Sequence, residues 1–278
     1  LYLTNGSSSG IITAVLALVN KNEKVLVWKN SHRCHKNAVE LAGGVPVYYK
    51  LNQNEEWDIP EALLPSDLEN YLKNDKIKVV IVTSPSYEGI VSDIKSLKEV
   101  CKKYGTYLIV DEAHGALYPF SEKLPETAIK YADIVVQSLH KTAGGLNPTA
   151  LIHSNVDIDL QPALDKISTT SPSYPILATI EKNILFLNSK RGKKVLDKLL
   201  NELIELRNIC KKVEFYGDDI TKILIKKEGL TGEELSEILF DKYNIEDEKT
   251  NSKSTMLLCG VGTSLKTIKK LADVLSKF

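Results

Sequence analysis

The chain has 278 residues, of which 43% are hydrophobic and 26% charged, and its 36 basic residues balance 36 acidic ones. A chain of this length can bury a substantial core, in one large domain or two smaller ones. A net charge of zero argues against a nucleic-acid-binding or membrane-surface protein, because neither sign dominates. Four separated cysteines without a Cys-x-x-Cys pair argue against a metal site and fit a reducing cytoplasm. The longest apolar run, residues 11–19, is too short to cross a bilayer.

The chain enters a Gly/Ser-rich turn, residues 4–10, almost at once, and its first residue is leucine. We therefore expect a fragment or a processed chain that lacks an N-terminal segment. A helix predicted over Ile11–Asn20 follows the turn directly. Free backbone amides, hydroxyls and the positive end of a helix dipole together suit a phosphate. A flexible linker or tag remnant is the simpler alternative. The hydroxyls that would contribute are those of Ser7, Ser8 and Ser9.

Residues 1–153 alternate short apolar runs with stretches of helical period. Continuous apolar strands separated by helices indicate an α/β fold, with a mostly parallel sheet covered on both faces. Ligands of such folds bind at the carboxyl ends of the strands. The predicted strands are Val25–Trp28, Val45–Tyr49, Val79–Thr83, Tyr107–Val110, Ile134–Gln137 and Ala150–His153, and the further predicted helices are Lys36–Leu41 and Asp93–Tyr104.

Two strand-end loops carry polar side chains that could meet a ligand. His32 follows the first predicted strand and could stack on a cofactor ring. A solvent-exposed loop histidine is the simpler reading, and the neighbouring His35 leaves the assignment open. Ser84 follows the third predicted strand and would bring a hydroxyl close to a cofactor. Pro85 and Gly89 in the same loop are equally explained by a plain turn.

An acid and a lysine, thirty positions apart, follow two further strands. The strand at 107–110 leads into Asp111, and the strand at 134–137 precedes Lys141. This is the pair that pyridoxal phosphate (PLP) requires: the lysine forms a Schiff base, and the acid keeps the pyridine nitrogen protonated. His114 and His140 lie beside these anchors. With His32, three of the five histidines fall in predicted strand-end loops.

The pattern changes after residue 174. One long helical period over 175–213 predicts a connecting helix between a cofactor-binding domain, residues 1–174, and a small α+β domain, residues 214–278. Residues 247–254 are polar and are predicted to form a loop. The small domain is expected to contain a strand at Thr221–Ile225, a helix opened by a capping-box-like Thr231–Glu234, a strand at Met256–Cys259 and a final amphipathic helix at Ser264–Leu275.

These motifs together resemble the major domain of the Orn/Lys/Arg decarboxylase family, whose members are PLP enzymes of the three-layer, aspartate aminotransferase-like fold type I. The resemblance is carried by Ser-x-His-Lys-Thr at 138–142, by Asp-Glu-Ala-His-Gly at 111–115, and by the spacing from His32 to Gly-Gly-Val-Pro at 43–46. It runs from Thr4 to beyond Tyr174 and continues more weakly to 231–235.

The resemblance assigns roles to residues of this chain. It implies that Lys141 forms the Schiff base and that Asp111 pairs with the pyridine nitrogen. Ser138 would hold the phosphate together with Ser7 and Ser8. His32, rather than His35, would stack over the ring. His140 would lie near the substrate as a proton donor or a neighbour of its carboxylate.

The implied activity is decarboxylation of a basic amino acid, arginine, lysine or ornithine, to the amine, in cytoplasmic polyamine biosynthesis. A homodimer or higher oligomer is expected, with residues 169–174 reaching the partner subunit's cofactor phosphate. The alternatives are another fold-type I activity, an aminotransferase or a lyase, and a PLP-binding fragment without full activity. No arginine follows Arg207. This favours release of the carboxylate, because many aminotransferases of this fold hold it with a small-domain arginine.

Overall fold

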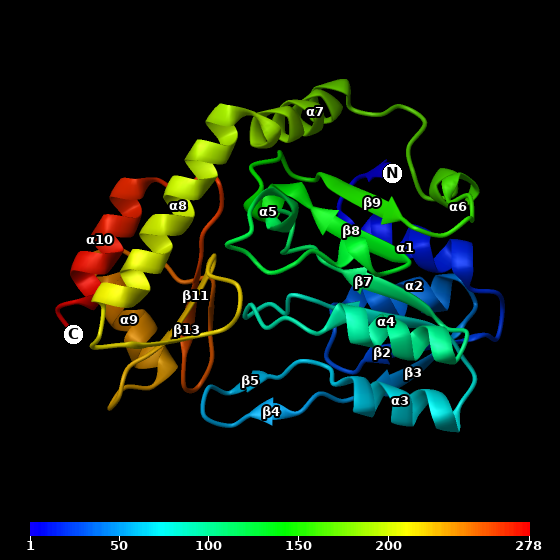
Figure 1. The fold of residues 1–278 in the computed structure, drawn as a ribbon, viewed down its shortest axis with the longest axis horizontal. Coiled ribbons are helices and arrows are strands. Elements are labelled where there is room, and N and C mark those ends of the chain that lie inside the picture. Colours follow the sequence, from blue (N-terminus) through cyan, green and yellow to red (C-terminus); the bar gives the residue numbers. More distant parts are fainter.

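The computed structural model describes all residues from 1 to 278 and is built around a seven-stranded sheet between helices (Figure 1). The strand order is β1-β9-β8-β7-β6-β2-β3. Neighbours from β8 to β3 are parallel, whereas β9 is antiparallel to both β8 and β1. The prediction of an α/β fold with a mostly parallel sheet is confirmed. The strands are β1 (Tyr2–Thr4), β2 (Lys24–Trp28), β3 (Val45–Tyr49), β6 (Ile77–Thr83), β7 (Tyr107–Asp111), β8 (Ile134–Ser138) and β9 (Ala150–Ser154).

Helices cover both faces of this sheet, which explains why its strands are apolar along their length. α1 (Ser7–Leu18) and α2 (Arg33–Leu41) pack on the face that contains Ile109. α3 (Pro65–Asn74) and α4 (Ile94–Lys103) pack on the opposite face, which contains Leu108 and Val110 (Figure 1). The shorter helices are η1 (Tyr118–Phe120), η2 (Ala128–Lys130), α5 (Leu139–Thr142) and α6 (Gln161–Asp165).

Several elements begin or end at other residues than the apolar pattern predicts. α1 starts at Ser7 rather than Ile11, because Gly6 serves as its N-cap and the three serines form the first turn. Strands β7 and β8 include their final polar residues, Asp111 and Ser138, because ladder pairing continues through them. Helix α3 and a small hairpin, β4 (Gln53–Asn54) and β5 (Ile59–Pro60), were not predicted.

The stretch predicted as one connecting helix contains two helices, α7 (Tyr174–Asn188) and α8 (Lys190–Ile209). Ser189 between them has extended backbone, and its hydroxyl accepts a hydrogen bond from the Gly192 amide at 3.0 Å. A Cβ at Gly192 would lie 1.9 Å from the Phe186 carbonyl oxygen. The sharp approach of the two helices therefore depends on a serine cap and a glycine, which a hydrophobic period does not reveal.

Residues 214–278, called here the C-terminal unit, form a second sheet with antiparallel neighbours in the order β10-β11-β13-β12. The predicted capping box is confirmed: the Thr231 hydroxyl accepts from the Glu234 amide at 3.1 Å, and the Glu234 carboxylate accepts from the Thr231 amide at 2.8 Å. Part of the predicted polar loop forms β12. The elements are β10 (Glu214–Tyr216), β11 (Lys222–Lys226), α9 (Gly232–Tyr243), β12 (Lys249–Thr250), β13 (Thr255–Leu258) and α10 (Leu265–Leu275).

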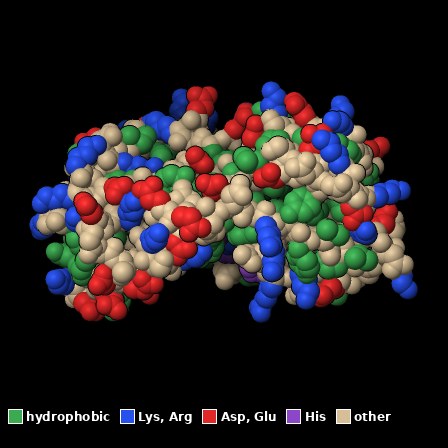
Figure 2. All heavy atoms as spheres, turned by 90° about the horizontal axis from the view of Figure 1, so that it is seen from below, with side chains coloured by type: hydrophobic (Ala, Val, Ile, Leu, Met, Phe, Trp, Pro, Cys, Tyr) green, Lys and Arg blue, Asp and Glu red, His purple; other side chains and the backbone are tan.

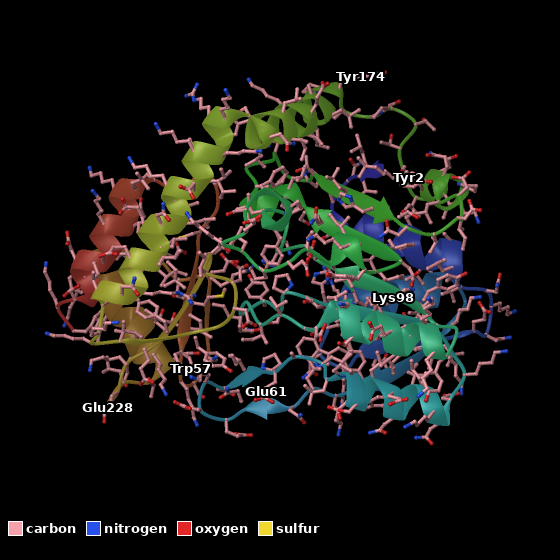
Figure 3. All side chains as sticks on the ribbon, in the orientation of Figure 1. Tyr2, Trp57, Glu61, Lys98, Tyr174 and Glu228 are labelled. Atoms are coloured by element: carbon pink, nitrogen blue, oxygen red, sulfur yellow. The ribbon has the colours of Figure 1, made fainter.

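The C-terminal unit packs against the rest of the chain through apolar contacts. Trp57, from the turn of the β4–β5 hairpin, stacks on Tyr216 with ring centroids 5.2 Å apart and lies beside this unit in Figure 3. Leu224 and Met256 complete a small buried cluster around Trp57. A larger core joins α5, α7 and α8 to both helices of the C-terminal unit. No helix of the chain combines the length and apolar character needed to cross a membrane.

Candidate active site

A cavity of about 720 Å³ lies at the carboxyl ends of the parallel strands, where the fold predicts a ligand. The first turn of α1 and the loops after β2, β6 and β7 form much of its wall, together with α5. Residues 248 and 249 close it from the C-terminal unit. On the face shown in Figure 2, acidic and basic side chains are interspersed, so neither charge dominates there.

Lys141 reaches this cavity from α5, directly after β8. Its Nζ lies 2.9 Å from Nε2 of His114. Burial lowers the pKa of Lys141, although the nearby carboxylate of Asp111 opposes that shift. A lowered pKa favours the neutral amine, which is the nucleophilic form of a lysine.

Asp111 faces the same cavity from the end of β7 and is held by two hydrogen bonds. His35 Nε2 lies 2.8 Å from its Oδ2, and the Ala113 amide donates to its Oδ1 at 3.1 Å. Burial alone would raise the pKa of Asp111. The hydrogen bond and charge of His35, with the charge of Lys141, outweigh burial and lower that pKa. The carboxylate therefore stays charged and can pair with a cation in the cavity.

The two neighbouring histidines have different positions. His32 is the N-cap of α2: its Nδ1 accepts from the Cys34 amide at 3.3 Å, and its ring lines the cavity. Burial lowers the pKa of His32, which favours the uncharged ring. His35 lies one turn further, fully buried behind Asp111. Of the two, only His32 is placed to contact a ligand, and stacking by His32 remains a prediction.

The start of α1 forms an open end of the cavity. Gly6 has φ +88° and provides no side-chain cap, so the first amides of this twelve-residue helix have no side-chain acceptor. Ser7 and Ser8 line the cavity. Ser9 does not: its hydroxyl donates to the Asn5 carbonyl oxygen at 3.2 Å. An anion would therefore meet the amides and the first two serines.

The remaining predicted residues differ in how close they come to the cavity. His140 lines it, and its Nδ1 accepts from the Thr149 amide at 3.2 Å. His114 also lines it. Ser138 is buried beneath the wall, with a hydroxyl that has no hydrogen-bond partner. Ser84 is buried away from the cavity, and its hydroxyl accepts from the Ser92 amide at 3.1 Å. The Ser84 hydroxyl therefore stabilises its own loop, and a ligand contact by Ser84 remains a prediction.

Sequence reasoning missed several residues of the cavity wall. Glu88 is buried, accepts from Ser86 at 3.1 Å, and forms an ion pair with Lys249. Tyr87 donates from its hydroxyl to Glu248. Glu248 and Lys249 belong to the segment predicted only as a polar loop. A loop pattern carries no signal for which distant cavity it will cover, so no sequence feature could have identified them.

Comparison with known proteins finds a matching family and several relatives of similar sequence. The family described as Orn/Lys/Arg decarboxylase, major domain, matches residues 1–223. Arginine decarboxylase of Bacillus subtilis (strain 168) is 26% identical over 298 residues, covering 99% of this chain and 61% of the relative. The inducible ornithine decarboxylase of Lactobacillus sp. (strain 30a) is 26% identical over 243 residues, covering 74% of this chain and 33% of the relative. This chain therefore spans less than two thirds of either relative.

The structure has similar solved relatives. The constitutive lysine decarboxylase of E. coli superposes with a TM-score of 0.84 at 18% sequence identity. The match covers 100% of this chain and 48% of that one. At this identity the likeness shows a shared fold.

Proposed function

Because this chain belongs to the Orn/Lys/Arg decarboxylase family, we propose that it carries the cofactor-binding part of an enzyme that decarboxylates arginine, lysine or ornithine. The substrate loses its α-carboxylate as carbon dioxide, takes up a proton at Cα and leaves as the amine. The cofactor of the family is pyridoxal phosphate. The observation that carries the proposal is that Lys141 and Asp111 line one cavity, where burial lowers the pKa of the lysine and the acid is held charged.

The residues of the cavity fit this cofactor. The amides at the start of α1, with Ser7 and Ser8, suit its phosphate. Thr83 lines the cavity with a buried hydroxyl that has no partner in the protein, so it has a free hydrogen bond to offer. Asp111 supplies the charge that a protonated pyridine nitrogen requires. His32 supplies a ring at the cavity wall.

When bound, pyridoxal phosphate supplies an electron sink for the electron pair that carbon dioxide leaves behind. The protein's part is to hold charges and protons. Asp111, fixed by His35, keeps a proton on the pyridine nitrogen. Lys141 provides the amine that binds the cofactor. Lys141 or His140 returns a proton to Cα after the carboxylate departs, since both line the cavity.

The charge at the cavity's outer wall supports a basic substrate. Lys249 pairs with Glu88, while Glu248 contacts only the uncharged hydroxyl of Tyr87. The wall therefore offers a carboxylate to the distal amine or guanidine of a basic amino acid. No arginine lines the cavity, and Arg207 donates to backbone carbonyl oxygens at 3.1 and 3.4 Å. This favours decarboxylation over an aminotransferase reaction that keeps the carboxylate in an arginine clamp.

The test is to incubate the purified protein, supplied with pyridoxal phosphate, separately with arginine, lysine and ornithine, and to identify the products by chromatography. We expect one amine to dominate, and Lys141→Ala to abolish both the amine and the visible absorbance of the lysine-bound cofactor. Lys36→Ala, at an exposed lysine of α2, is the matched control. A keto acid as product would favour an aminotransferase. Bound cofactor without any amine would favour a PLP-binding fragment.

The finer biological setting is also a proposal. We infer a homodimer or larger assembly, in the cytoplasm, in polyamine biosynthesis, with residues 1–174 as the cofactor-binding domain, 175–213 as a connection and 214–278 as a small domain. Tyr174, at the start of α7, is 76% exposed and points away from the molecule in Figure 3. Residues 169–174 are thus accessible to a second subunit. Sedimentation equilibrium with and without Tyr174→Ala would test this arrangement, and a monomer at all concentrations would exclude it.

A further inference from the structure

Three side chains that can bind a metal ion meet beside the cavity of the candidate active site. They are Cys34, His35 and Asp111, whose candidate ligand atoms all lie within 4.8 Å of one another. All three are buried, and Cys34 and Asp111 line the cavity. The lack of a Cys-x-x-Cys pair argues against a local metal-binding motif. Here, however, two ligands come from the first turn of α2 and the third from the end of β7, so cysteine spacing could not indicate the cluster.

Asp111 is a buried anion that has no lysine or arginine partner within the protein. Nε2 of His35 lies 2.8 Å from its Oδ2, and the Ala113 amide donates to its Oδ1 at 3.1 Å. Nζ of Lys141 is bonded instead to Nε2 of His114, at 2.9 Å. A charge removed from water is costly unless a cation or a metal ion compensates it. In the cofactor-free protein, this carboxylate can therefore accept a cation.

The three donor atoms select the kind of cation. A thiolate and an imidazole are ligands of zinc and similar transition metals, whereas magnesium and calcium prefer oxygen ligands. With one thiolate and one carboxylate, a divalent ion makes the buried cluster electrically neutral. Zinc in proteins is often held by three side chains and a water molecule in the fourth position. The cavity that Cys34 and Asp111 line, of about 720 Å³, has room for this water.

Metal binding requires small changes of position and of protonation. Zinc–ligand bonds of about 2.0–2.3 Å place tetrahedral ligands about 3.3–3.6 Å apart. His35 and Asp111 must therefore separate slightly from their 2.8 Å contact. The Cys34 thiol loses its proton to solvent, and the proton that Nε2 of His35 donates to Asp111 moves to Nδ1. Since Nδ1 has no hydrogen-bond partner in the protein, this unpaired N–H weakens binding, and we expect a chelator to remove the metal.

We propose that Cys34, His35 and Asp111 form a zinc-binding site of the cofactor-free protein, with a water molecule as the fourth ligand. Zinc and the proposed cofactor exclude each other, because both require the carboxylate of Asp111. Zinc therefore blocks cofactor loading, and bound cofactor protects the site from zinc. This exclusion rests on the proposed function, whereas metal binding itself can be measured without any cofactor.

The experiment adds Co²⁺, a spectroscopic substitute for zinc, to the full chain after hydroxylamine has removed any cofactor. A tetrahedral cobalt site with a thiolate ligand gives visible bands and a near-ultraviolet sulfur-to-cobalt band. We expect both at one cobalt ion per chain, and we expect Zn²⁺ but not Mg²⁺ to abolish them. Cys34→Ala should remove the near-ultraviolet band. It should also lower the cobalt affinity by about 100-fold or more, since even partners outside the ligand set contribute about 10–100-fold.

The matched control is Cys101→Ala. Cys101, in α4, is also a buried free cysteine, but it does not line the cavity. Its removal should leave the cobalt spectrum unchanged and the affinity within about twofold. A spectrum without the sulfur-to-cobalt band, or a band that persists in Cys34→Ala, overturns the inference. Asp111→Asn, which keeps the shape but not the charge, replaces Cys34→Ala if that variant does not fold, and an unchanged cobalt affinity there has the same consequence.

A second measurement separates this inference from the proposed function. Protein loaded with pyridoxal phosphate, and freed of excess by gel filtration, should retain no cobalt in metal analysis. Cobalt bound at Cys34 in the loaded protein would overturn the exclusion, and with it the proposed contact between Asp111 and the cofactor. A chain that binds cobalt through Cys34 but takes up no pyridoxal phosphate would overturn the proposed function alone.

Discussion

The hydrogen bond between His35 and Asp111 gives a prediction that separates a charge-supporting histidine from an ordinary buried one. The change is His35→Leu. It leaves Asp111 fully buried, with the Ala113 amide as its remaining donor. Removing the hydrogen-bond partner of a buried carboxylate costs about 3 kcal/mol. We therefore expect the free energy of unfolding of the cofactor-free protein to fall by about that amount at pH 7.

The pH dependence provides the sharper part of the test. Without His35, burial should raise the pKa of Asp111 above its ordinary 3.8. The folded variant would then bind a proton that the unfolded chain does not bind between 3.8 and the raised value. Its stability relative to wild type should recover on acidification, by about 1.4 kcal/mol for each unit of that rise. Urea unfolding followed by circular dichroism, at about pH 7 and about pH 5, measures both quantities.

The matched control is His153→Leu. His153 is also largely buried, but its Nε2 meets the neutral Gln137 Oε1 at 3.2 Å, and burial lowers its pKa to about 4. Losing this neutral hydrogen bond should cost about 1 kcal/mol at pH 7. At pH 5 the variant also escapes the cost of keeping His153 uncharged in the folded protein, so its stability relative to wild type should rise by about 2 kcal/mol. If His35→Leu cost no more than His153→Leu at pH 7, or if its cost were the same at both pH values, the charge-supporting role of His35 would be refuted.

Three further predictions address other parts of the structure. Ser8→Asp should leave the cofactor-free protein as stable or up to about 1 kcal/mol more stable, because an acid favours a helix N-terminus. It should also weaken pyridoxal phosphate binding about tenfold or more by repelling the phosphate, as measured by equilibrium dialysis. Gly192→Ala should lower the free energy of unfolding by about 3 kcal/mol through its clash with Phe186, whereas Gly262→Ala, which meets no atom within 4 Å, should change it by less than about 0.5 kcal/mol in thermal melts. Burial lowers the pKa of Lys222 from its ordinary 10.5 to about 8, so the unfolded chain binds more protons than the folded protein between these pH values. Wild-type stability should therefore rise with pH across that window by up to about 3 kcal/mol. This rise should vanish in Lys222→Met.

The large sheet could be predicted because its strands are covered on both faces and are therefore apolar without interruption. The ends of those strands could not be predicted, because Asp111 and Ser138 are polar and end the apolar run but still pair with the neighbouring strand. The break between α7 and α8 could not be predicted for a related reason. It depends on a serine cap and on a glycine at a close backbone contact, and neither changes the helical period.

The candidate site was predictable where one strand end specifies one residue. Asp111 is the last residue of β7, Lys141 comes three residues after β8, and both line the cavity. Distinguishing His32 from His35 required knowing where α2 begins. His32 is the N-cap of that helix, whereas His35 falls on its buried face three residues later. Lys222 and Glu248 could not be predicted as neighbours of the site. They come close to it only because the C-terminal unit packs against the larger domain, and no local sequence pattern encodes that packing.

The cavity wall consists of residues that are far apart in the sequence, and these residues are synthesised at different times. The wall residues up to Pro148 are synthesised well before Lys249, with 249 − 148 = 101 residues between them. At roughly 5–20 residues per second, a ribosome needs about 5–20 s to cover that distance. Throughout this interval the nascent chain already contains Lys141 and the start of α1 but lacks Lys249. A growing chain can therefore expose Lys141 to small molecules before the residues that close its cavity have been made.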